Sequence, residues 1–235
     1  MPDMPAAFPH IDPARLPGMI DPARTALVVV DVQVDFAAPE GLLGRLGVDL
    51  SAAHEAIDRC ERLVAAARRA GATVALMRVV TRPETDSRAL KTLMARRGQP
   101  GGEAICRAEG GGADYYRIFP EPGDIEVQKL LYDSFHGTDF DARLRARDID
   151  TLVVCGLSTD CCVDQTARAA FHRDYDVFLV SDACAAYEPG LHESALNALE
   201  KNCALLTTTD AVEAAWHHGG NAAARVAALS LPAGE

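Results

Sequence analysis

Residues 151–170, TLVVCGLSTDCCVDQTARAA, decide the fold of this chain. The stretch opens with a short apolar run that Gly156 ends, which predicts a buried strand rather than a helix. Beyond a tight turn, four apolar residues recur at the spacing of one helix face: Val163, Ala167, Ala170 and Phe171. The stretch is therefore a strand–turn–helix unit, and Cys162 lies at or near the first turn of its helix.

The position of Cys162 makes it a candidate catalytic sulfur. Free backbone N–H groups and the positive end of the helix dipole favour a thiolate at a helix start. A cysteine is nevertheless often a buried and inert small hydrophobe, and this chain has seven of them. The interpretation therefore depends on the groups that other strand ends bring to the same place.

The rest of the chain alternates strand and helix patterns. Five more strands are predicted, at 26–30, 72–80, 123–129, 176–183 and 203–211. Helices are predicted at 50–70, near 87–97, up to 144, at 191–201 and at 212–217. This alternation predicts an α/β fold, a Rossmann-like three-layer αβα arrangement around a six-stranded, mostly parallel sheet. A ligand should bind outside the carboxyl ends of its strands.

With 235 residues, about half of them hydrophobic, the chain is long enough for one sizeable core. We expect a proline-rich arm over 1–23, a single domain over 24–217 and a tail over 218–235. Residues 81–120 are polar and contain two glycine runs. An excursion of this length in a compact domain is typical of a lid or a substrate loop.

Composition excludes several classes of partner. The net charge of -11 comes from scattered acidic residues, which argues against a nucleic-acid surface. No apolar run is long enough to cross a membrane, and the N-terminus lacks the features of a secretory signal. An odd number of irregularly spaced cysteines is typical of reduced thiols. We therefore expect a soluble cytoplasmic protein with no nucleic-acid or membrane partner.

Two more strand ends carry groups that a cysteine hydrolase needs. Asp31 follows the first strand and could take the proton of a thiol and later return it to a leaving amine. Lys129 ends the strand at 123–129 and would favour both the carboxylate and the thiolate. Burial would instead disfavour the charged form of Asp31, and the sequence leaves open which effect is larger.

Three motifs, DVQVDF (31–36), EVQK (126–129) and GLSTDCCVDQTARAA (156–170), occur in this order. Together they resemble the isochorismatase-like cysteine hydrolases over about residues 25–212. The resemblance implies that family's fold and a catalytic triad of Asp31, Lys129 and Cys162. It also implies a cis peptide bond between Leu157 and Ser158, and an oxyanion hole made by the backbone N–H groups of Ser158 and Cys162.

Departures from the family narrow the expected chemistry. Nicotinamidases of this family bind a metal through an Asp-x-His-x-x-x-His run, whereas residues 78–88 here read RVVTRPETDSR. We therefore expect no metal and no other cofactor. Members that cleave the vinyl ether of isochorismate lack the cysteine, so its presence favours hydrolysis of a C–N bond. ALKT (89–92) and EPGDIEVQK (121–129) resemble ureidoacrylate amidohydrolases, and carbamoyl-cleaving relatives share the layout.

The predicted function is a metal-independent cysteine amidohydrolase acting on a small linear amide or a ureido or carbamoyl compound. Five residues are predicted to line its pocket: Gln33, Phe36, Tyr132, Phe135 and Thr159. Arg82 and Arg88 are candidates for contact with a substrate carboxylate. The alternatives are a vinyl-ether hydrolase and a thiol redox or binding protein. Family members are often dimers or tetramers, so we expect a homo-oligomer.

Overall fold

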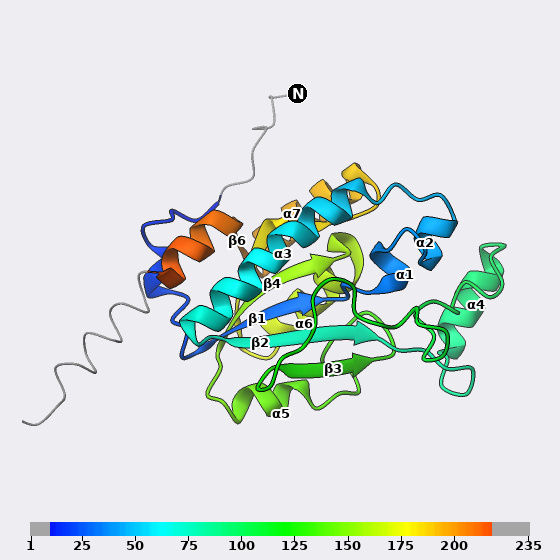
Figure 1. Cartoon of the computed structure of the whole chain (residues 1–235), viewed down its shortest axis with the longest axis horizontal. Helices are drawn as coiled ribbons and strands as arrows, with labels where there is room; N and C mark the ends of the chain where they lie inside the picture. Colours follow the sequence, from blue (N-terminus) through cyan, green and yellow to red (C-terminus); the bar gives the residue numbers. More distant parts are fainter. Residues whose placement is uncertain (1–9, 218–235) are drawn as a thin grey trace, which may run out of the picture.

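The computed structural model describes residues 10–217, so the predicted tail at 218–235 lies outside the described residues. It has one six-stranded sheet, ordered β3-β2-β1-β4-β5-β6 (Figure 1). Every neighbouring pair is parallel. The strands are β1 (Thr25–Val30), β2 (Thr73–Val79), β3 (Ile125–Lys129), β4 (Thr151–Leu157), β5 (Asp176–Ala185) and β6 (Leu205–Thr207). The predicted fold class is confirmed, although β6 is much shorter than the predicted 203–211.

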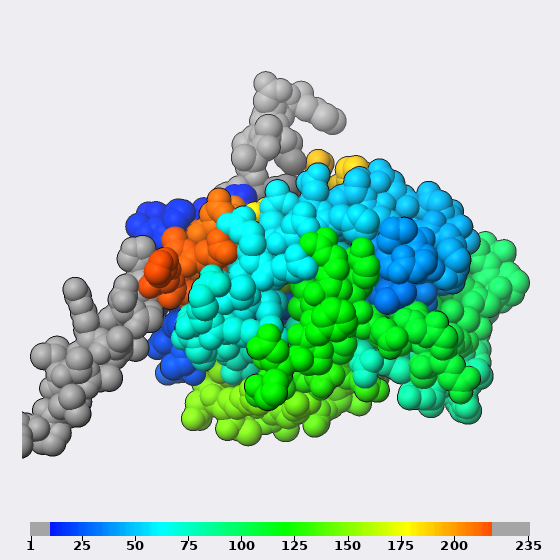
Figure 2. All heavy atoms as spheres, in the orientation of Figure 1, coloured from blue at the N-terminus to red at the C-terminus, as the bar shows by residue number. Residues whose placement is uncertain are grey.

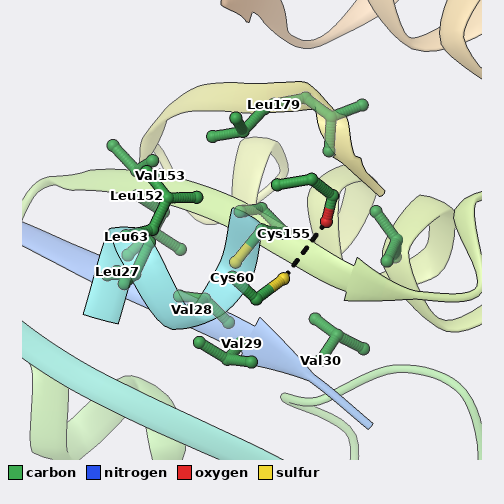
Figure 3. Close-up of a cluster of buried hydrophobic side chains, with 14 of the residues drawn as sticks. Leu27, Val28, Val29, Val30, Cys60, Leu63, Leu152, Val153, Cys155 and Leu179 are labelled. Atoms are coloured by element: carbon green, nitrogen blue, oxygen red, sulfur yellow. Dashed lines mark hydrogen bonds between the residues drawn. The ribbon is translucent and has the colours of Figure 1, made fainter. Parts of the chain in front are cut away.

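The central strands are apolar because helices cover both of their faces. All residues of β1 and of β4 are buried. Figure 3 shows these strand residues in one buried cluster, with Leu63 near Leu27 and Cys60 near Val28. The thiol of Cys60 donates a hydrogen bond to the carbonyl of Ala183 at 3.3 Å, so it is a structural cysteine.

Helices pack on both faces of the sheet (Figure 1). On one face, α3 (Ser51–Ala70) contacts β1, β2, β4 and β5, and ends at Gly71 with φ 77° as its sequence predicts. Arg62 of α3 pairs with Asp210 and Glu213 of the last helix, which covers 209–217. On the other face, α6 (Asp164–Phe171) packs against β5, beside α5 (Phe140–Arg145) and α7 (Pro189–Asn202).

Local expectations around the helices need two corrections. Phe171 was predicted to face the core with the rest of its helical stripe, but its side chain is 49% exposed because α6 ends there. Part of the predicted arm also belongs to the folded body. Within residues 10–23, Leu16 and Ile20 are buried, and the carbonyl of Ile20 accepts a hydrogen bond from the indole of Trp216.

The predicted excursion at 81–120 contains one helix, α4 (Arg88–Arg96), which has no buried residue. This helix lies at the right-hand end of the molecule in Figures 1 and 2. The excursion closes on itself just beyond β2, where the backbone at Thr81 pairs with Arg107. Among the described residues, no helix is long and apolar enough to cross a membrane.

Candidate active site

The candidate site lies between the neighbouring strands β1 and β4. At this point the strand order reverses, because β2 and β3 lie on one side of β1 and β4 to β6 lie on the other. Asp31 directly follows β1, Lys129 is the last residue of β3, and Cys162 follows β4. Carboxyl ends of parallel strands meet at one edge of a sheet, and this switch point is where α/β proteins bind ligands. The structure thus brings the three predicted catalytic residues to one edge.

Gly156 allows β4 to pass close to the end of β1. Its φ is 115°, and a Cβ atom at this position would lie 2.2 Å from the carbonyl oxygen of Val30. No other residue type fits that backbone and that space. The sequence therefore needs glycine here if the turn carrying Cys162 is to sit beside Asp31.

Asp31 and Lys129 form a buried ion pair. The ammonium Nζ of Lys129 donates to Oδ2 of Asp31 at 2.6 Å, and to the carbonyls of Leu131 and Tyr132 at 3.1 and 3.0 Å. Both side chains are essentially inaccessible to solvent. Oδ1 of Asp31 is buried and accepts no hydrogen bond from the described residues. One carboxylate oxygen is thus held in place while the other stays free to take a proton.

Lys129 also contacts the thiol of Cys162. Burial alone would lower the pKa of Lys129, but the charges of Asp31 and Cys162, with their hydrogen bonds, outweigh burial and raise it. Lys129 is therefore a fixed cation at neutral pH. It is placed to hold Asp31 and to balance negative charge that develops on the sulfur.

The protonation of Cys162 differs from the expectation that a helix start would favour the thiolate. A hydrogen bond with Cys161, burial and the charge of Asp31 together raise the pKa of Cys162, and Lys129 only partly offsets them. The sulfur therefore carries its proton in the resting site. A nucleophilic role for this sulfur would require a neighbouring base, and Asp31 has a free oxygen for this task.

The turn that carries Cys162 is a π-helical turn, η2 (Thr159–Val163), ahead of α6. The peptide bond between Leu157 and Ser158 is cis, as the family resemblance implies. The carbonyl of Ser158 accepts hydrogen bonds from the N–H groups of Cys161 and Val163, both at 3.1 Å. These bonds fix the backbone on either side of Cys162.

A cavity of about 200 Å³ opens over the sulfur. Its floor includes Ser158, Cys161 and Cys162, and two predicted residues, Phe36 and Tyr132, line it. Part of its wall comes from the 81–120 excursion, through Thr81, Leu90, Met94, Gly102, Glu103 and Ile105. The excursion therefore contributes to the cavity, as expected of a substrate loop.

Three residues predicted to line the pocket lie elsewhere. Gln33 is buried, and its side-chain amide bonds the backbone of Val79 and Ala113, so it joins β2 to the excursion. Phe135 is 4% exposed and packs against the rings of Phe140 and Tyr175. Thr159 is buried under the turn, where its hydroxyl is 2.8 Å from Nδ1 of His192.

Tyr187 is a wall residue that sequence reasoning missed. It follows β5 at the same edge of the sheet and lines the cavity. Its hydroxyl donates to the backbone carbonyl of Phe36 at 2.8 Å, which fixes the ring of Tyr187 against the backbone at Phe36. Its place one strand beyond Cys162, just after a strand end, was a signal in the sequence that could have identified it.

A larger hollow of about 840 Å³ lies at the opposite, amino-terminal edge of the sheet. Its lining runs over 18–24, 150–151, 171–178 and 200–205 and contains none of the three candidate catalytic residues. Within residues 10–217 no group of three His, Cys, Asp or Glu side chains could hold a metal ion. That the enzyme works without a metal stays a prediction.

Comparison with known proteins agrees with this geometry. Residues 25–211 match the family model described as the isochorismatase domain. The chain belongs to the isochorismatase family. Among its relatives, the ureidoacrylate amidohydrolase RutB of Methylobacterium radiotolerans is 39% identical over 202 residues, which cover 80% of this chain and 78% of the relative. The corresponding protein of Methylorubrum extorquens is 37% identical over 217 residues, 86% of this chain and 87% of its own.

Solved isochorismatase-family structures have the same fold. A cysteine hydrolase from Pseudomonas syringae pv. phaseolicola superposes with a TM-score of 0.76 at 30% identity, covering 85% of this chain and 95% of its own. An N-carbamoylsarcosine amidase from Thermoplasma acidophilum gives a TM-score of 0.64 at 27% identity, covering 80% and 97%.

Proposed function

We propose that this isochorismatase-family protein is a cysteine amidohydrolase. It cleaves the C–N bond of a small linear amide or of a ureido or carbamoyl compound, through a thioester intermediate, and releases ammonia. The observation that carries the proposal is the buried Asp31–Lys129 pair beside a cysteine that opens onto a cavity. The names of the relatives, ureidoacrylate amidohydrolase and N-carbamoylsarcosine amidase, support the same class of bond.

The first half-reaction uses the free oxygen of Asp31. Asp31 takes the thiol proton of Cys162, and the sulfur attacks the amide carbon as the C=O π electrons move to oxygen. Lys129 stays protonated and keeps Asp31 in place during this transfer. The tetrahedral adduct then collapses, the C–N bond breaks, and Asp31 returns its proton to the departing nitrogen, which leaves as ammonia.

The second half-reaction consumes one water. Asp31 takes a proton from water, the hydroxide attacks the thioester carbon, and the C–S bond breaks. The sulfur recovers the proton that Asp31 holds, so the enzyme returns to its resting state with a protonated thiol. The net reaction is amide plus water to carboxylic acid plus ammonia.

The substrate oxygen becomes negatively charged in the tetrahedral adduct, and hydrogen-bond donors at the cavity floor are needed to stabilise it. We assign this role to the backbone N–H groups of Ser158 and Cys162, which flank the cavity on the turn after β4. A pre-placed donor of this kind is typically worth about 2.7–4 kcal/mol of activation barrier. Backbone donors cannot be removed by substitution, so this role is best examined through the residues that hold the turn.

The test is ammonia release from a panel of linear amides, ureido acids and carbamoyl amines by the wild type, Cys162→Ala and Cys162→Ser. Removal of a covalent nucleophile should lower turnover by at least about 10³-fold. Cys203→Ser is the matched control, because Cys203 lies outside the cavity and should leave turnover unchanged. If Cys162→Ala retains more than a few per cent of the wild-type rate, covalent catalysis at this residue is refuted.

A further inference from the structure

The walls of the cavity do not suit a substrate carboxylate. Within residues 10–217 the lining contains no lysine, arginine or histidine, and its one carboxylate belongs to Glu103. Much of the remainder is hydrocarbon or aromatic, including Phe36, Leu90, Met94 and Leu131. Such walls favour the transfer of apolar groups from water, whereas an anion would lose hydration there without a partner.

Cations around the cavity are held by other groups or lie outside its walls. Arg107 donates to both carboxylate oxygens of Asp86, at 2.6 and 2.8 Å. Arg82 and Arg88, the predicted carboxylate contacts, are exposed and are absent from the lining. Arg97 is exposed as well and is absent from the lining, although its charge acts on the hydroxyl of Tyr132.

Apart from the Asp31–Lys129 pair beside the sulfur, Glu103 is the charged side chain among the residues that line the cavity. It is half-buried in the excursion and lines the cavity. Its charge helps to raise the pKa of Arg107, but the guanidinium of Arg107 donates its paired hydrogen bonds to Asp86 and not to Glu103. The carboxylate of Glu103 is therefore placed to accept a hydrogen bond from a ligand and to repel an anion.

We propose that the site takes small primary amides or terminal ureas with an apolar body and a neutral or cationic far end, and that Glu103 selects against substrates bearing a carboxylate. An apolar cavity of about 150 Å³ holds benzene, so a body of about four to six carbons fits the space over Cys162. The inference rests on the proposed function. It separates this chain from relatives whose named substrate, ureidoacrylate, is an anion.

Three amides of matched length test the charge preference: pentanamide, 5-aminopentanamide and the monoamide of glutaric acid. We expect the kcat/KM of the wild type for the cation to exceed that for the anion by about tenfold or more. Glu103→Gln should lower this ratio about fivefold, and Glu103→Lys should invert it. Glu109→Gln removes the same charge from an exposed position outside the lining, so it should leave the ratio unchanged.

A binding experiment separates this inference from the proposed function. Calorimetry with Cys162→Ala measures the affinity of the same three amides without turnover, and the cation should bind more tightly than the anion. If no amide releases ammonia but this order holds, the proposed reaction fails and the charge preference stands. If the anion binds more tightly, or is the best substrate of the wild type, the inference is overturned. It is also overturned if both Glu103 variants leave the ratio unchanged.

Discussion

Replacing Lys129 with methionine tests how the buried ion pair supports the site. Methionine keeps a flexible apolar stem of similar reach, so the packing around the side chain is largely retained. The change removes the ammonium and the hydrogen bonds it donates to Asp31, Leu131 and Tyr132. Asp31 is left as a buried carboxylate whose other oxygen already has no partner among the described residues.

The expected cost follows from this geometry. Breaking a buried ion pair by removing one partner typically costs about 3–5 kcal/mol, because the remaining charge is uncompensated. With a urea m-value of about 2–3 kcal/mol/M, the unfolding midpoint should fall by about 1–2.5 M. Such a loss is a large part of the stability of an ordinary domain, so Lys129→Met should fold only marginally.

A second substitution distinguishes the lost charge pairing from a packing defect. Asp31 has φ 51°, in the left-handed region, which asparagine also tolerates. Asp31→Asn combined with Lys129→Met removes the unpaired charge and should restore at least half of the lost stability, without activity. Lys201→Met is the control, because Lys201 pairs with Glu200 at 4.0 Å on the surface and should cost less than about 1 kcal/mol.

Urea unfolding followed by the fluorescence of Trp216 is the assay, since this buried residue is the only tryptophan of the chain. Neighbouring charges raise the pKa of Lys129 despite its burial. The contribution of Lys129 to the free energy of unfolding is therefore fully present below about pH 10.4, the usual pKa of lysine, and it is lost as the pH rises through the higher pKa of the folded state. The stability difference between the wild type and Lys129→Met should thus narrow only in strong alkali. A cost below 1 kcal/mol, or a double variant no more stable than the single one, would refute the reasoning.

Three further predictions follow from other features of the site. Gly156→Ala should lower the free energy of unfolding by more than about 3 kcal/mol or prevent folding, because the added Cβ would overlap the backbone of β1. Gly190→Ala is the control, because a Cβ there meets open space and should change the unfolding midpoint little. Burial lowers the pKa of His192 in the folded state, so the unfolded chain takes up a proton first as the pH falls below about 6.5, and the free energy of unfolding decreases. In His192→Gln the free energy of unfolding should therefore fall less steeply on the acid side. Asp35 accepts backbone hydrogen bonds at both carboxylate oxygens, one of them from the excursion, so Asp35→Ala should raise KM and speed proteolysis within 81–120. An unchanged KM and digestion rate would show that this anchor is not needed.

Much of the fold could be predicted because the deciding signals are local. The buried apolar runs of β1 and β4 identify central parallel strands, and Gly71 marks the end of α3. Once the strands are parallel, their carboxyl ends share one edge of the sheet. That Asp31 and Lys129 lie at the same edge then follows from their positions at strand ends, although 98 residues separate them, whereas their direct contact across β2 is known only from the structure.

The walls of the cavity could not be predicted in the same way. Phe135 and Tyr132 lie in one loop, yet the first packs in the core and the second lines the cavity. What decides between them is contact with distant residues, such as the packing of Phe135 against Tyr175. Leu90 and Met94 of α4 reach the cavity because the excursion folds back on itself, which local patterns do not encode.

The protonation of Cys162 was also beyond sequence reasoning. Its place near a helix start predicts a thiolate, but burial, Cys161 and Asp31 act in the opposite direction. Each of these effects depends on three-dimensional distances. The raised pKa of Cys162 agrees with the transfer of its proton to Asp31 that is expected from the sequence, and it argues only against a helix start being enough to form the thiolate.

Capture of the covalent intermediate tests the central claim most directly. The wild type is mixed with an amide substrate, quenched in acid within one turnover, and analysed by mass spectrometry after digestion. We predict an added acyl mass on Cys162, absent from Cys162→Ala and lost as ammonia release is completed. Turnover of the same substrate with no acyl mass on the peptide that carries Cys162, together with an active Cys162→Ala, would contradict the account.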